Sequence, residues 1–127
     1  MPARTPDRGY SNTPLPRKLG IREGSAVAIL AEGVRHRLGG SYDVIVFFAV
    51  TQAEVKRRHR RLAARLVPSG RLWISWPKRG SGVATDISEH SLRELILPSG
   101  LVDNKVAAID ERWSALQFVI RLKDRPG

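Results

Sequence analysis

Apolar runs separated by amphipathic stretches organise the chain. Residues 26–30 and 42–50 are rich in apolar side chains without polar alternation, as expected of strands buried on both faces of a sheet. Residues 71–76 form a third run, and we expect Trp73 and Trp76 to lie on one side of it, covered by helices. The pattern predicts three neighbouring parallel strands.

The longest helix is predicted between the second and third strands. Over 51–67 the apolar residues fall on one helical stripe, and basic residues occupy the remaining circumference. Thr51 and Glu54 have the spacing of a capping box, in which side chains satisfy the first backbone amides of a helix. The Pro-Ser-Gly sequence at 68–70 would end this helix.

Shorter helices are predicted elsewhere. Residues 32–38 would form a crossover helix, which allows the first two strands to pair in parallel. Near the N-terminus, Thr13 followed by Pro14 has the form of a helix cap with proline at the first helical position. Asp86 and Glu89 repeat the capping-box spacing before a third helix.

The C-terminal part carries a predicted hairpin, with strands at 103–109 and 115–122 and Trp113 holding it in place. Together, these elements predict an α/β fold, a three-layer Rossmann-like domain with a mainly parallel five-stranded sheet and an antiparallel strand from the C-terminal hairpin. The strand at 115–122 should run antiparallel beside the third strand, with 103–109 outside it. The strand at 26–30 should form the opposite edge.

Length and ends limit the domain organisation. A chain of 127 residues has room for one domain, which we place at 13–123. Residues 1–12 have the composition of a flexible basic tail, and we expect a disordered C-terminus at 124–127. The first strand at the sheet edge needs a cover for its unpaired backbone groups, either the segment from Thr13 to Ile21 or a second subunit, and we favour a homodimer.

Charge is the strongest bulk property. The chain carries 22 Lys and Arg against 12 Asp and Glu, a formal net charge of +10. Such a field attracts nucleic acid, anionic ligands or acidic proteins. The absence of cysteine excludes disulfides and thiol chemistry. With neither a secretory signal nor a membrane-length apolar run, we expect a cytoplasmic protein that does not bind membranes.

The loop after the third strand is the best candidate for a ligand site. It precedes a capped helix, and open α/β sheets bind ligands at this end of their strands. Glycines permit close backbone approach, and helix N-termini favour anions. We predict weak binding of a group such as phosphate by Lys78, Arg79, Gly80, Ser81, Gly82 and Thr85. Asp86 complicates this, because its carboxylate would occupy the amides of the following helix.

The basic face of the helix at 54–66 is a second candidate. A row of cations on a helix can bind nucleic acid through phosphates without reading the base sequence. The residues concerned are Lys56, Arg57, Arg58, Arg60, Arg61 and Arg65. The alternative is that this face is only solvated.

No set of residues predicts catalysis or a bound metal. His59 lies on the apolar stripe of its helix, where a lone histidine is usually a core residue with one satisfied nitrogen. His36 and His90 are isolated from each other and have no metal-ligand spacing. Ser75 and Ser81 lack a nucleophile-elbow sequence. We therefore predict no catalytic residue, no metal and no cofactor.

The stretch from Tyr42 onward resembles the second half of class I methyltransferases that use S-adenosylmethionine. The matching elements are the YDVIVF strand at 42–47, the L-x-P-x-G-R-L sequence at 66–72 and the Gly-Leu followed by a hairpin at 100–122. The resemblance implies a Rossmann-like fold with an antiparallel last strand. The sequence departs from it at 30–34, where the Gly-rich turn of such enzymes is reduced to one glycine, and two strands of the cofactor-binding half have no counterpart.

Nearly the whole chain is also similar to a family of short bacterial proteins, a domain of unknown function. The matching segments are Tyr10-Ser11, Thr13-Pro14-Leu15, Lys18 to Ile21, Trp73 to Asp86, Ile109-Asp110 and Trp113-Ser114. Our leading hypothesis is a non-catalytic binding or regulatory domain with a methyltransferase-like scaffold. The alternatives are a nucleic-acid-binding protein that uses the basic helix and an S-adenosylmethionine-dependent methyltransferase.

Overall fold

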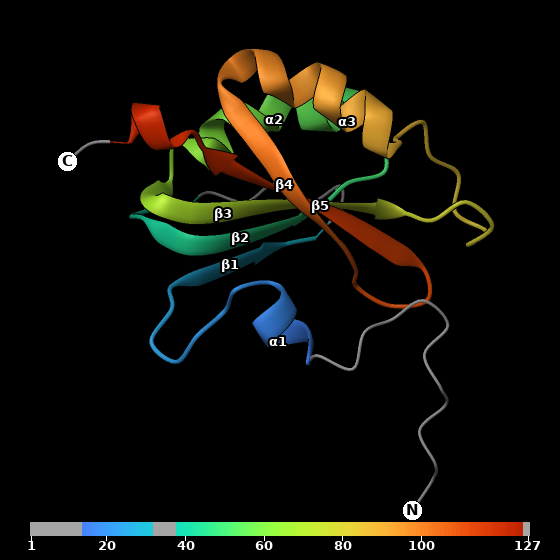
Figure 1. Cartoon of the computed structure of the whole chain (residues 1–127). Coiled ribbons are helices and arrows are strands. Elements are labelled where there is room, and N and C mark those ends of the chain that lie inside the picture. The colour runs from blue at the N-terminus through green and yellow to red at the C-terminus, as the bar shows by residue number, and fades with distance from the viewer. Residues whose placement is uncertain (1–13, 32–37, 126–127) are drawn as a thin grey trace, which may run out of the picture.

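The computed structural model describes residues 14–31 and 38–125, in which five strands form one sheet (Figure 1). The strands are β1 (Val27–Leu30), β2 (Tyr42–Phe48), β3 (Leu66–Pro77), β4 (Leu101–Ala108) and β5 (Trp113–Ile120). Their order is β1-β2-β3-β5-β4. β1, β2 and β3 are parallel, and β5 is antiparallel to both β3 and β4. The predicted α/β fold and strand order are confirmed.

Helices cover one face of this sheet, and a single helical turn lies against the other (Figure 1). α2 (Gln52–Ala63) and α3 (Glu89–Ile96), the latter continued by the 3-10 turn η1 (Leu97–Ser99), bury their apolar stripes on the first face. α1 (Leu15–Lys18) packs on the second face. The 3-10 turn η2 (Leu122–Asp124) follows β5. These elements make the three layers that the sequence predicts.

The boundary between α2 and β3 differs from the prediction. The helix ends at Ala63, and Leu66, which was expected on the helix, pairs with Tyr42 in the sheet. The register then shifts, so that the Pro-Ser-Gly sequence lies in an irregular part of β3 and does not end the helix. Gly70 is buried there, and a Cβ at that position would lie 2.9 Å from the carbonyl oxygen of Val67. Glycine is needed at position 70 because a side chain there would clash with the backbone of Val67.

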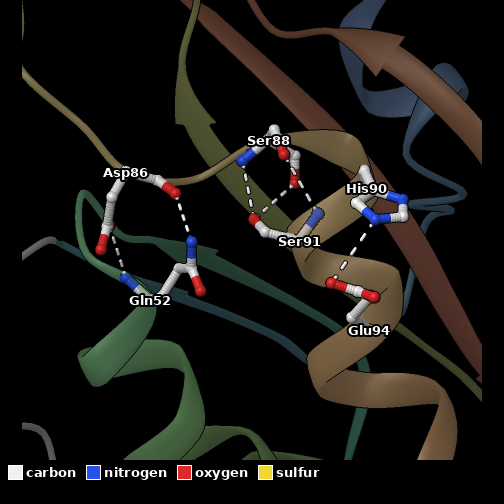
Figure 2. A network of polar contacts seen from close by, with 6 residues as sticks. All are labelled: Gln52, Asp86, Ser88, His90, Ser91 and Glu94. Carbon is white, nitrogen blue, oxygen red and sulfur yellow. Dashed lines mark hydrogen bonds and ion pairs between the residues drawn. The ribbon is translucent and has the colours of Figure 1, made fainter.

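The cap of α3 also differs from the prediction. Ser88 is the N-cap: its Oγ accepts from the amide of Ser91 at 3.0 Å, and the Oγ of Ser91 accepts from the amide of Ser88 at 2.8 Å (Figure 2). The predicted capping pair of Asp86 and Glu89 is therefore wrong. Ser91 takes the role that a capping box usually gives to an acidic residue, because its hydroxyl can also accept a hydrogen bond from the amide of the N-cap residue.

The cap of α2 agrees with the predicted capping box at Thr51, whereas the side chain of Glu54 pairs with Arg58. Thr51 is the N-cap, and its hydroxyl accepts from the amide of Glu54 at 3.2 Å. This bond satisfies one of the amides that a helix N-terminus leaves without a partner.

Trp73 and Trp76 lie on opposite faces of the sheet, which contradicts the expectation that they share one side. They are three positions apart, and successive side chains of a strand alternate between its faces. Trp76 belongs to the core under α2 and α3, whereas Trp73 packs on the α1 side. There the indole Nε1 of Trp73 donates to the carbonyl of Leu19 at 2.9 Å, and both residues are buried.

Contacts from the sheet hold α1 in place, since a single helical turn has no stability of its own. Besides the bond from Trp73, the ammonium of Lys105 donates to the carbonyl of Lys18 at 3.0 Å. The ammonium of Lys18 donates to the carbonyl of Ala108 at 3.4 Å. α1 is thus bound to both β3 and β4.

The two sheet edges differ in character. Among the described residues, β1 pairs with β2 alone, it carries no charge, and its Ile29 side chain is 64% exposed. β4 at the other edge has a register shift between Asp103 and Lys105, and irregular, charged edges resist further pairing. Arg93 of α3 donates to Asp103 at 2.8 Å, and this bond, with a second one to Glu89, raises the pKa of Arg93. A homodimer formed at β1 stays a prediction.

Some predicted features lie outside the described residues. These are the tail at 1–12 and the crossover helix at 32–38 except for Leu38, which is not helical. The predicted start of the first helix is wrong by one residue, because Pro14 is the N-cap of α1 and not its first helical residue. The domain limits at 13 and 123 stay a prediction. Within the described ranges, no helix is long and apolar enough to cross a membrane.

Replacing Trp73 by Phe should destabilise the fold more than replacing Trp76 by Phe. Both changes remove the same indole volume from the core, but only the first leaves the buried carbonyl of Leu19 without its donor. The difference should be about 1–3 kcal/mol in the free energy of unfolding, measured with urea. Equal losses would mean that the bond does not hold α1 to the sheet.

Candidate functional site

The carboxyl ends of β2 and β3 form the region where an open α/β sheet would bind a ligand. β2 ends at Phe48, and three residues lead from it into α2. β3 ends at Pro77, and residues 78–88, here called the β3–α3 loop, lead from it to α3. The loop therefore connects the end of β3 to the start of α3, the two elements on which the predicted anion site depends.

The first part of the β3–α3 loop is an exposed turn. The amide of Ser81 donates to the carbonyl of Lys78 at 3.1 Å, and Gly80 has a φ of 86°, which favours glycine. Gly82 also has positive φ, and a Cβ at either glycine would meet nothing within 4 Å. Arg79 is exposed beside them. The turn thus contains two basic residues and two glycines with positive φ, and anion binding by them stays a prediction.

The second part of the loop is bound to the end of β2. The hydroxyl of Thr85 donates to the carbonyl of Val50 at 2.7 Å and accepts from the amide of Ile87 at 3.1 Å. Its hydrogen is therefore committed to the backbone. The hydroxyl of Thr85 is therefore used by the fold, as is the backbone amide of Ser81, which donates to Lys78.

Asp86 lies at the N-terminus of α2, not at that of α3 (Figure 2). Its Oδ1 accepts from the backbone amide of Gln52 at 2.8 Å, and its carbonyl accepts from the side-chain amide of Gln52 at 2.5 Å. A carboxylate here satisfies one of the helix's unpaired amides and favours its positive end. The protein's own side chain thus occupies the position that an anion would take at α2.

The predicted basic face is only partly exposed. Lys56, Arg57, Arg60, Arg61 and Arg65 are exposed, the last of them beyond the end of the helix.

Arg58 differs from the other basic residues of α2. Its guanidinium lies 5.0 Å above the ring of Phe47, and it forms an ion pair with Glu54 at 3.6 Å. Its side chain is 15% exposed. Arg58 therefore contributes to the packing of α2 on β2 more than to the outer face.

His59 is a core residue. It is 3% exposed, and its Nδ1 lies 2.9 Å from the carbonyl of Val55, so this nitrogen carries the hydrogen. Its Nε2 is buried and has no hydrogen-bond partner in the described part of the protein. His90 is exposed, with its Nε2 3.4 Å from Glu94 (Figure 2). Within residues 14–31 and 38–125, no three acidic or histidine side chains are grouped to hold a metal.

Trp113 and Ser75 have structural contacts. The ring of Trp113 meets that of Phe48 edge to face, with centroids 5.0 Å apart, so it joins the β4–β5 hairpin to β2 across β3. The hydroxyl of Ser75 donates to the carbonyl of Ser114 at 2.9 Å. These contacts explain both residues by packing and hydrogen bonding.

Comparisons with known proteins identify the fold. No protein-family model matches the sequence, and no curated protein matches it. Two solved structures of magnesium protoporphyrin IX methyltransferase (ChlM) from Synechocystis PCC 6803, with bound SAH and with bound SAM, are similar to this one. Their TM-scores are 0.53 and 0.52, at 20% identity over 67% of this chain. The fold is methyltransferase-like.

The likeness is limited to the fold, because the identity is low. This chain covers 47% of one ChlM structure and 42% of the other, so it spans less than half of their length. Membership of the family of short bacterial proteins stays a prediction, since no family model matches.

Sequence reasoning missed the contacts that Thr85 and Asp86 make with the end of β2. Their partners lie 34 or 35 positions away in the chain, so no local pattern could reveal them. The one available signal was the order of the elements, which brings the β3–α3 loop beside the β2–α2 connection at the same edge of the sheet.

Replacing Asp86 by Ala should destabilise the protein by about 1 kcal/mol, because the amide of Gln52 at the start of α2 loses its acceptor. The control is Glu94→Ala, which removes an exposed carboxylate from an ion pair that should contribute less than about 0.5 kcal/mol. Thermal or urea unfolding measures both. Equal, small losses would show that Asp86 does not hold α2.

Proposed function

We propose that this chain is a non-catalytic binding domain on a methyltransferase-like scaffold, and that it holds an anionic group in the turn after β3. The observation that carries the proposal is the bonding at the end of β2. The carbonyl of Val50 and the amide of Gln52 are both satisfied by the β3–α3 loop. A cofactor entering there would have to displace bonds the fold already makes.

The sequence supports the same conclusion. The segment at 30–34 has one glycine where a methyltransferase needs a Gly-rich turn for close approach of the cofactor. Only 11 residues separate Leu30, the last residue of β1, from Tyr42, the first residue of β2, so the two strands that a methyltransferase has at this point have no counterpart here. We also propose that the chain is a member of the short bacterial family, for which no enzymatic activity is assigned.

The turn at 78–82 is the proposed anion site. Both glycines are exposed and have positive φ, and successive backbone amides in such a turn can form a concave site for an anion. Lys78 and Arg79 add positive charge, and the amide of Lys78 is bonded to the carbonyl of Arg112 at 2.7 Å, which fixes the base of the turn. Thr85 does not take part, because its hydroxyl donates to Val50.

Isothermal titration with S-adenosylmethionine and with its demethylated product tests the non-catalytic assignment. We expect no saturable heat at micromolar ligand, because the protein's own side chains occupy the end of β2. Micromolar affinity for either compound would overturn the proposal in favour of a methyltransferase.

Phosphate titration followed by amide NMR tests the anion site. The amides of Gly80 and Gly82 should shift together and saturate, whereas the amide of Gln52 should not move, because it is bonded to Asp86. Arg79→Gln should weaken the effect, and Lys123→Gln, at an exposed site elsewhere, should leave it unchanged. Scattered shifts without saturation would leave the turn with a structural role only.

A further inference from the structure

The exposed residues of α2 are four cations and one alanine. Lys56, Arg57, Arg60 and Arg61, here called the basic face of α2, are exposed and follow the spacing i, i+1, i+4 and i+5. Residues four apart are neighbours on a helix, so these side chains form two adjacent rows along it. Ala53 at the start of the helix is exposed as well.

In the part of the chain that the structure describes, these charges have no acidic partner. Within the described residues, the ion pairs involve Arg58, His90 and Arg93, and none includes a side chain of the basic face. A helix that only needs solubility gains stability from opposite charges four positions apart, whereas like charges at that spacing weaken it. Here Lys56 stands next to Arg60, and Arg57 next to Arg61.

The helix dipole explains only part of this arrangement. Cations in the last turn are favourable because they lie near the negative end of a helix, and Arg60 and Arg61 are placed there. Lys56 and Arg57 lie in the middle of α2, where the dipole offers no compensation. A negatively charged partner would turn their mutual repulsion into attraction.

The chemistry of the face selects the kind of partner. Proteins that bind single-stranded nucleic acid stack its bases on exposed aromatic rings, and the basic face has none. Gln52, the one amide side chain of α2, is already bonded to Asp86. What remains is a convex ridge of positive charge, which suits the phosphate rows of a duplex.

We propose that the basic face of α2 binds the backbone of double-stranded nucleic acid without reading its sequence. This interaction goes beyond the proposed anion site and does not depend on it, because the turn at 78–82 belongs to a different element.

Fluorescence anisotropy with a labelled DNA duplex of about 20 base pairs, at several salt concentrations, tests this inference. The variant is Arg57→Gln, Arg60→Gln, Arg61→Gln, and the control is Arg17→Gln, Arg22→Gln, Arg121→Gln. Both triple variants remove three exposed charges, so they have the same net charge. Arg57→Gln, Arg61→Gln is a milder second variant, and circular dichroism confirms that each protein is folded.

The α2 triple variant should bind at least about tenfold more weakly, and its slope of log affinity against log salt should be shallower by about 0.9 per lost phosphate contact. The control should lose much less affinity and keep its slope. Equal effects of both triples would mean that net charge alone attracts DNA, and this would overturn the proposal. It would also be overturned by absent duplex binding at low salt, by tighter binding of a single strand, or by equal affinity for polyglutamate.

Discussion

Two hydrogen bonds join the β3–α3 loop to the segment that follows β2. The donor of Thr85 goes to the carbonyl of Val50, and the carboxylate of Asp86 accepts from the amide of Gln52. Backbone groups at the carboxyl edge of a parallel sheet are normally where a ligand is held. In this methyltransferase-like fold, the β3–α3 loop satisfies the carbonyl of Val50 and the amide of Gln52 within the chain.

The remaining charged surfaces are separate from that edge. The ammonium groups of Lys105 and Lys18 donate to the carbonyls of Lys18 and Ala108 respectively, and Arg58 lies over the ring of Phe47. The cations of the outer side of α2 have no such structural use in the described residues. The chain has a net charge of +10, and structural contacts account for only some of its basic residues. In the described part of the chain, the basic residues without such contacts are most concentrated on α2.

Long apolar runs made the sheet predictable, because a strand buried on both faces leaves a clear signal and short connections limit the possible orders. Details set by competition between nearby residues were less predictable. Ser88 replaced Asp86 as a cap, and Gly70 shaped a strand irregularity where a helix end was expected. The exposed glycine turn was visible in the sequence. The bonding of Asp86 was not, because its partner is 34 positions away.

The central claim is that the carboxyl end of β2 is closed by the protein itself, and hydrogen exchange of one amide tests it most directly. The amide of Gln52 is bonded to Asp86 and belongs to the first turn of α2, where amides otherwise exchange rapidly. We predict slow exchange of this amide in the unliganded protein and no change when S-adenosylhomocysteine is added. Rapid exchange without the compound, or protection that appears only with it, would contradict the account.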